Sequence, residues 1–485
     1  MLAGSPAREK HPPALPMLFF TEMWERYSYY TMRALLVLYL VNAVGIERAN
    51  ALEIYGMYTG LVYLTPIIGG YLADRYFGRR KAILIGGITM ALGHFAMAFE
   101  SLLYPALGLL IVGNGFFKPN ISSLLGTLYR EHDPRRDRGF TIFYMGVNLG
   151  AFLSGVIGGT LGEKLGWHWG FASAGVGMCF GVAQFLYSQH KLGSAGLPDS
   201  RDRLNARDFI EVLTVSFAAI PLVYLVMNVW RAVGPLWNGL PGTGKLAVVA
   251  LVIAAIWATT RRRAGATEER LSVEEWHRIL AILILGFFVV FFWAGFEQAG
   301  GTMNLFADKQ TDRMIFDWEM PATWFQSVNP LFVVLLGPLV SGLWALLDRK
   351  RIEPPTPVKM GLGMIILGLG FIILAIAQGR AETIGKVSIQ WLFIVYIIHT
   401  TGELFLSPVG LSMVTKLAPA RLGSMLMGVW YLANAIANYL AGTLENMLSG
   451  SDIPLYWFLV GSSIGAGALL LLLTPLIKYL MRGKG

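Results

Sequence analysis

Charged residues and cysteine are both scarce in this chain of 485 residues. Asp, Glu, Lys and Arg make up 14% of it, against about 25% in soluble domains, while 55% of it is hydrophobic. The single cysteine, Cys179, excludes an intramolecular disulfide. Apolar stretches of about 20 residues recur along the whole chain, so we predict an all-α membrane protein that crosses the bilayer many times.

The net charge of +9 does not indicate a nucleic-acid-binding protein, because the basic residues are placed by topology. They cluster in every second loop, at 75–81, 130–138, 201–207, 261–263 and 349–351, and are sparse in the loops between. Cytoplasmic loops are enriched in Lys and Arg, so we expect both termini in the cytoplasm. The first fifteen residues lack an apolar segment with a cleavage site, which predicts no cleaved signal peptide.

About fourteen transmembrane helices are predicted, an even number that agrees with both termini on one side. The predicted spans are 16–43, 51–73, 82–100, 103–128, 139–163, 167–189, 209–230, 245–261, 277–301, 322–347, 359–378, 388–416, 422–447 and 455–481. Polar linkers isolate the pair 209–230 and 245–261 between two groups of six. We therefore predict an N-terminal six-helix bundle over 1–190, a linker with two additional helices over 191–275 and a C-terminal six-helix bundle over 276–485.

The two groups of six also resemble each other, since corresponding helices end in Asp74-Arg75 and in Asp348-Arg349. Two parallel six-helix repeats with a central connection are the plan of the major facilitator fold. In that fold, the substrate binds between the two halves near the middle of the membrane.

The first predicted helix carries an unusual set of ionisable residues. Helical spacing places Glu22, Arg26, the pair Tyr29/Tyr30 and Arg33 on one stripe. Charges that face lipid are costly, so this stripe should face other helices or a water-filled cavity. For Glu22, near the expected cytoplasmic end, simple hydration remains an alternative.

Further charges lie inside other predicted helices. Lys118 and Glu403 each lie about fifteen residues from the outer end of their helices, roughly mid-bilayer at 1.5 Å per residue. Equal depth and opposite sign make them candidate partners across the two halves, with a static packing pair as the alternative. Glu297 is an isolated carboxylate in an apolar stretch, which is typical of a residue that takes up and releases a proton. His94 and His399 are more simply explained by hydrogen bonds to neighbouring polar groups.

Several segments resemble the signatures of the proton-dependent oligopeptide transporters, the peptide branch of the major facilitators. They lie at 22–30, 69–78, 116–120, 140–150, 325–330 and 402–408, and so cover both halves. Tyr27 stands where that family commonly has Phe. The additional helix pair between the bundles is typical of bacterial members.

The resemblance implies proton-coupled symport of di- and tripeptides across the inner membrane of a bacterium by alternating access, with no enzymatic activity and no cofactor besides protons. Cavity-lining residues carried over from the family motifs are Tyr29, Tyr30, Tyr63, Asn148, Trp293, Asn329 and Trp430. Arg26, Arg33 and Lys118 would bind the peptide carboxylate, since Arg suits a planar carboxylate, and Glu403 would bind its ammonium group. Candidates for proton coupling are Glu22, Glu25, Arg26 and Glu297, and the candidate gating pairs are Arg33–Glu297 and Lys118–Glu403.

Two other functions remain open from the residues. A transporter of nitrate or another small anion would use the Arg and Lys residues but would not need Glu403. A membrane-embedded enzyme or receptor is disfavoured, because the chain shows no metal-ligand spacing, no paired catalytic motif and no soluble output domain. We expect no metal and no nucleic acid partner, and a monomer.

Overall fold

The computed structural model describes residues 10–130, 133, 135–197, 206, 207, 210, 214, 239, 241, 272–419 and 422–481. The long helices of the first half are α1 (Leu15–Asn42), α2 (Arg48–Leu72), α3 (Arg79–Ala96), α4 (Leu103–Thr127), α5 (Arg136–Leu153) and α6 (Trp167–Ser188). Those of the second half are α9 (Val273–Phe296), α11 (Phe325–Arg349), α12 (Thr356–Ile384), α13 (Gln390–Leu417), α14 (Gly423–Leu448) and α15 (Leu455–Leu480). The predicted helix 245–261 lies outside the described residues, and so does the predicted helix 209–230 except for residues 210 and 214.

Several long helices continue into shorter segments. The π-helical segments are η1 (Ala73–Phe77), η3 (Ser154–Gly159) and η4 (Leu161–Leu165), and the 3-10 segments are η2 (Glu100–Leu102), η5 (Gln189–Leu192), η6 (Glu297–Gly300) and η7 (Ala322–Trp324). Helix α10 (Thr302–Lys309) follows η6. Strand β1 (Thr311–Asp312) pairs in parallel with β4 (Val387–Ser388), and β2 (Met314–Ile315) pairs antiparallel with β3 (Trp318–Glu319). These two-residue strands, and α10, were not predicted from the sequence.

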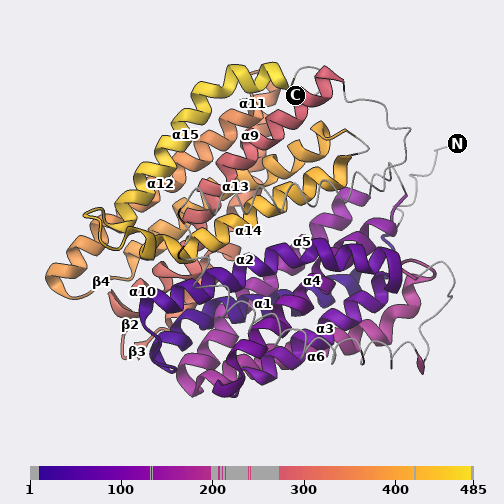
Figure 1. Ribbon diagram of the computed structural model, residues 1–485, viewed down its shortest axis with the longest axis horizontal. Helices are drawn as coiled ribbons and strands as arrows, with labels where there is room; N and C mark the ends of the chain where they lie inside the picture. Colours follow the sequence, from indigo (N-terminus) through magenta and orange to yellow (C-terminus); the bar gives the residue numbers. More distant parts are fainter. Residues whose placement is uncertain are drawn as a thin grey trace, which may run out of the picture.

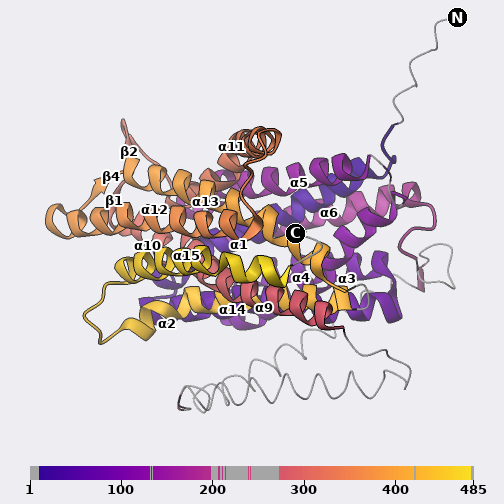
Figure 2. The ribbon, with the colours of Figure 1, turned by 90° about the horizontal axis from the view of Figure 1, so that it is seen from above.

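The two halves converge at one end of the molecule and diverge towards the other. In Figure 1 they meet where α10, β2 and β3 lie, which we call the closed end, and separate towards the end that holds the C-terminus. Figure 2, a view turned by 90°, places α10 and the strands β1, β2 and β4 together at that same end. The helices thus form two bundles that are in contact at the closed end.

Helical segments suited to a membrane dominate the chain, as predicted. In the part of the chain that the structure describes, nine segments are long and apolar enough to cross a bilayer. Helix α1 is not among them, although it has 28 residues. It carries too many charged residues to count as an apolar segment: Glu22, Glu25, Arg26 and Arg33. All four are buried inside the protein.

Some predicted helix boundaries were wrong by a few residues, for local reasons. Helix α3 begins at Arg79 rather than at 82, because Gly78, with φ 73°, is its N-cap residue. Helix α9 begins at Val273 rather than at 277, because Ser272 and Glu275 form a capping box. Helix α12 extends to Ile384 rather than to 378 and ends at Gly385, whose φ is 88°.

Glycines allow the halves to approach closely on two sides of the closed end. A Cβ atom on Gly56 of α2 would lie 2.8 Å from the Cα atom of Gly442 on α14, so any side chain there would separate the two helices. On the other side, Gly155 of η3 packs against Ser327 of α11, and the Ser327 hydroxyl donates to the carbonyl oxygen of Phe152 at 2.6 Å.

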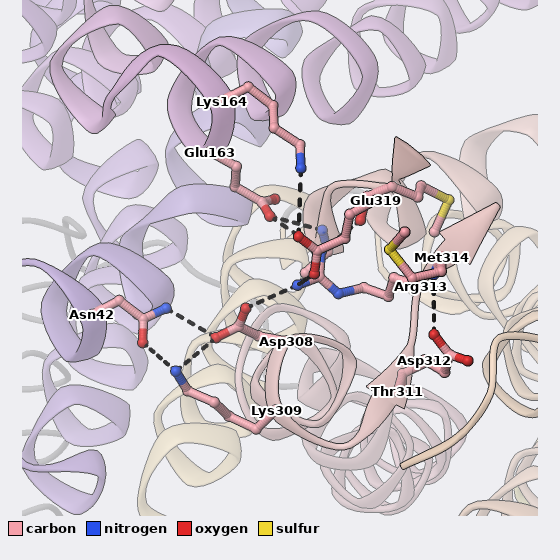
Figure 3. Close-up of polar contacts among 12 residues, drawn as sticks. Asn42, Glu163, Lys164, Asp308, Lys309, Thr311, Asp312, Arg313, Met314 and Glu319 are labelled. Atoms are coloured by element: carbon pink, nitrogen blue, oxygen red, sulfur yellow. Dashed lines mark hydrogen bonds and ion pairs between the residues drawn. The ribbon is translucent and has the colours of Figure 1, made fainter. Parts of the chain in front are cut away.

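A carboxylate in the middle of η4 binds η7 of the second half, which directly precedes helix α11. Glu163 accepts hydrogen bonds from the backbone N–H groups of Ala322 (2.9 Å) and Thr323 (2.8 Å), and from the Thr323 hydroxyl (2.7 Å). Figure 3 shows Arg313 beside it; Arg313 Nη1 lies 3.6 Å from Glu163, and Nη2 lies 3.0 Å from Glu319. We call these five residues the Glu163 network. It joins the two halves through one partly buried acceptor.

Replacing Glu163 with Gln should weaken the closed end, because a charged acceptor with three donors becomes a neutral one. A hydrogen bond to a charged group contributes about 1.5–3 kcal/mol. We expect the closed state to lose about 1–3 kcal/mol, which changes the ratio of states about five- to 150-fold. Cysteine labelling at Ser327→Cys, in a Cys179→Ser background and from the side of the closed end, measures this change.

Glu319→Gln is the matched control for this variant. Its side chain is 44% exposed, so its ion pairs contribute only about 0–1 kcal/mol and labelling should stay close to that of the parent. Equal labelling in the Glu163→Gln and Glu319→Gln variants would show that Glu163 does not hold the halves together.

Candidate functional site

The charged stripe of α1 lies inside the protein, as predicted. Arg26 is 3% exposed, Arg33 is 7% exposed and Glu25 is fully buried. Each of these charges has a partner, which is the condition under which charged groups are tolerated away from water.

Arg26 is the centre of the first cluster. Its Nε lies 3.2 Å from Oε1 of Glu22, and its Nη2 donates to Oε1 of Glu25 at 2.6 Å. Glu25 also accepts from Asn114 Nδ2 of α4 at 3.0 Å, a contact that the sequence did not predict. The second oxygen of Glu22 has no hydrogen-bond partner among the described residues. Glu22 thus keeps a free acceptor, whereas both oxygens of Glu25 are engaged.

Arg33 forms the second cluster, which joins the halves. Its Nη2 donates to Oε2 of Glu297 at 2.7 Å, and its Nη1 donates to Oε1 of Gln326 at 3.2 Å. Both partners are buried and belong to the second half. The predicted Arg33–Glu297 contact is therefore present. Gln326 was not predicted as a site residue, because a neutral amide in an apolar helix gives no charge signal.

Glu403 and Lys118 have separate surroundings. Glu403 accepts from Nδ2 of Asn329 at 2.7 Å, and the same nitrogen lies 3.1 Å from the Thr400 hydroxyl. Lys118 Nζ lies 4.4 Å from the centre of the Tyr63 ring and 6.0 Å from that of Tyr29. The predicted Lys118–Glu403 ion pair is not formed in this conformation. A cationic group on the first half and an anionic group on the second remain free to bind a ligand.

The other predicted cavity residues divide into two sets. Tyr30 lies beside Arg33, whose Cζ is 5.8 Å from the ring centre, and Trp293 packs edge-on against Phe296. Asn148 donates to a carbonyl oxygen of its own helix at 2.9 Å, and Trp430 is buried. Tyr30 and Trp293 thus lie near the second cluster, while the contacts of Asn148 and Trp430 do not connect them to it.

A small cavity of about 10 Å³ adjoins the second cluster. It is lined by Arg33, Phe296, Ala299, Gln326, Asn329, Tyr396, His399 and Thr400. Its volume corresponds to about one water molecule. His94 bonds the hydroxyl of Ser28 in the first half, as expected. For His399 the expectation was wrong in part, because its Nε2 has no hydrogen-bond partner among the described residues.

Comparisons with known proteins agree with this arrangement. A model of the POT family matches residues 80–457. An uncharacterised transporter of Bacillus subtilis is 39% identical, over 98% of this chain and 96% of the relative. A di-/tripeptide transporter of Lactococcus lactis is 33% identical, over 97% and 96%. The crystal structure of a peptide transporter POT in complex with sulfate superposes with a TM-score of 0.81 at 36% identity, over 98% of this chain and 96% of that chain.

The Arg33–Glu297 contact predicts a specific double-mutant result. Removing either partner should favour the state in which the closed end is open, by about 1–3 kcal/mol in a low-dielectric setting, so labelling at Ser327→Cys should rise. Once Arg33→Ala has removed the contact, adding Glu297→Ala should change little more. Full additivity of the two single effects would mean that the residues are not coupled.

Proposed function

Because this chain belongs to the POT family, we propose that it carries di- and tripeptides together with protons across the membrane by alternating access. The observation that carries the proposal is the placement of charge. A buried ion pair with a potential proton carrier closes one end, while Lys118 and Glu403 lie on opposite halves without pairing to each other. That arrangement suits a ligand with both a carboxylate and an ammonium group.

A short peptide always has these two groups, whatever its side chains. Lys118 and Arg26 of the first half would bind the carboxylate, and Glu403 of the second half would bind the ammonium group. Tyr30, Tyr63 and Asn329 offer hydroxyl and amide groups for the peptide backbone. A small inorganic anion has no positive group that Glu403 could bind. The presence of Glu403 therefore favours a peptide over nitrate as the substrate.

Proton coupling follows from the Arg33–Glu297 pair. Protonation of Glu297 removes one charge of the pair and so weakens the contact that holds the closed end. Glu22, with its free oxygen beside Arg26, is the second candidate for proton binding. A peptide and a proton can then drive the same transition if each binds one state more tightly than the other.

We also propose the orientation and the transport unit. The distribution of Lys and Arg supports cytoplasmic termini in the inner membrane of a bacterium, which makes the closed end the outer end and this conformation inward-facing. Every residue of the candidate site comes from a single chain, so a monomer is sufficient for transport.

Uptake of labelled dipeptide into proteoliposomes under an imposed pH gradient tests the proposed function. We expect the labelled dipeptide to accumulate only when the gradient is present. An excess of unlabelled tripeptide should reduce this accumulation by competition. Competition by nitrate, with no effect of peptides, would instead indicate an anion transporter. Binding of peptide without accumulation would argue against coupled transport.

Glu297→Gln should separate coupling from exchange, because it removes the group that binds the proton but keeps its size. Gradient-driven accumulation should be lost, while counterflow exchange of peptide, which needs no net proton movement, should largely persist. Measuring both in the same proteoliposomes controls for folding. Normal gradient-driven accumulation in this variant would exclude Glu297 as the proton carrier.

Glu403→Gln should weaken the binding of a free dipeptide much more than that of an N-acetylated one. A hydrogen bond to a charged group contributes about 1.5–3 kcal/mol, and the acetylated peptide lacks the ammonium group that would make it. Competition assays with the two peptides measure the difference. If both lose the same affinity, Glu403 does not contact the amino end of the peptide.

A further inference from the structure

Arg33 is held across the halves by two acceptors, of which only one can take up a proton. Its Nη2 binds the carboxylate of Glu297 at 2.7 Å, and its Nη1 binds the amide oxygen of Gln326 at 3.2 Å. Protonation of Glu297 therefore changes one contact of the guanidinium and leaves the other unchanged.

The amide of Gln326 is fixed in this orientation by the second half itself. Its Nε2 donates to the carbonyl oxygen of Ala299 and lies 3.4 Å from the hydroxyl of Tyr396. Gln326 is 5% exposed, so water does not compete freely for these contacts. With its nitrogen engaged on this side, the amide presents its oxygen to Arg33.

We propose that Gln326 is a positioning residue that sets how far protonation of Glu297 opens the gate. This inference rests on the proposed function. With Glu297 charged, both acceptors hold Arg33 and the closed end is stable. With Glu297 neutral, the amide oxygen of Gln326 still holds the guanidinium, so the gate loosens in proportion to the lost charge.

Among the described residues, Glu297 is the only carboxylate that bonds Arg33. The titratable and charged groups near the pair are Tyr29, Tyr30, Tyr55, Tyr63, Lys118, Tyr396, His399 and Glu403. Glu403 belongs to α13 and bonds Asn329, which lies one turn from Gln326 on α11. Apart from Tyr55, whose side chain interacts with Arg33, none of these groups hydrogen-bonds the Arg33 guanidinium among the described contacts. We therefore expect Glu297 to determine how the gate responds to pH, while the hydrogen bond from Arg33 to Gln326 does not change with pH.

Moving the carboxylate from one acceptor position to the other provides the sharpest test. In the double variant Glu297→Gln with Gln326→Glu, one oxygen of the ionised carboxylate faces Arg33, while the other faces the carbonyl oxygen of Ala299 and cannot donate to it. The protonated carboxyl group can donate to that carbonyl oxygen and release Arg33. We expect pH-driven accumulation to return, roughly tenfold above that of Glu297→Gln alone. Counterflow exchange by each variant shows that it is folded and binds peptide.

Two single variants in a wild-type background test the sign of the effect. Gln326→Leu keeps the bulk but removes the acceptor, so less protonation suffices for opening and the pH for half-maximal uptake should rise. Gln326→Glu adds a second charge for Arg33, so that pH should fall. If Gln326 acted only through packing, these two substitutions would not shift the pH profile in opposite directions.

Clear outcomes overturn the inference. If wild-type protein accumulates peptide but the double variant shows exchange without accumulation, Gln326 does not share the gate with Glu297. If the double variant fails to fold, the two single variants decide. An unchanged pH profile in both, or a shift in the same direction in both, would also show that Gln326 does not share the gate with Glu297. If wild-type protein shows no pH-driven accumulation, it is the proposed function that fails.

Discussion

The buried ion pair between Arg33 and Glu297 is the contact on which the rest of the arrangement depends. It crosses from α1 to the end of α9, so its formation fixes the position of one half relative to the other. Breaking a buried pair by neutralising one partner leaves the other charge without compensation, which is far more costly than losing a surface pair. In the proposed mechanism, one proton on Glu297 would therefore shift the equilibrium between the two bundles.

The ion pair is accompanied by close packing at the closed end. Gly56 and Gly442 bring two helices into backbone contact, and Gly155 does the same with Ser327. Contacts of this kind form only at short range and are lost together once the helices separate. Asn329, one turn from Gln326 on α11, bonds Glu403. Gln326, which bonds Arg33, and Asn329, which bonds Glu403, thus lie one turn apart on the same helix.

Much of this could be predicted from the sequence, because charge inside a membrane helix is a strong signal. The stripe on α1 and the Arg33–Glu297 partnership both follow from charges of opposite sign in apolar helices. Gln326 and Asn114 could not be found in this way, since neutral amides are common in such helices. The predicted pairing of Lys118 with Glu403 was wrong for a different reason. The depth of a residue along its helix can be counted from the sequence, but the distance between the two halves depends on the conformation.

The contact made by Glu163 has a consequence for how such proteins diverge. Two of its three donors are main-chain amides, which every residue except proline supplies. The side chain at 322 can therefore change without loss of a donor, and a change at 323 removes only the hydroxyl donor while both main-chain donors remain. Methods that detect contacts through correlated mutation would therefore give little signal for the two main-chain contacts of this junction.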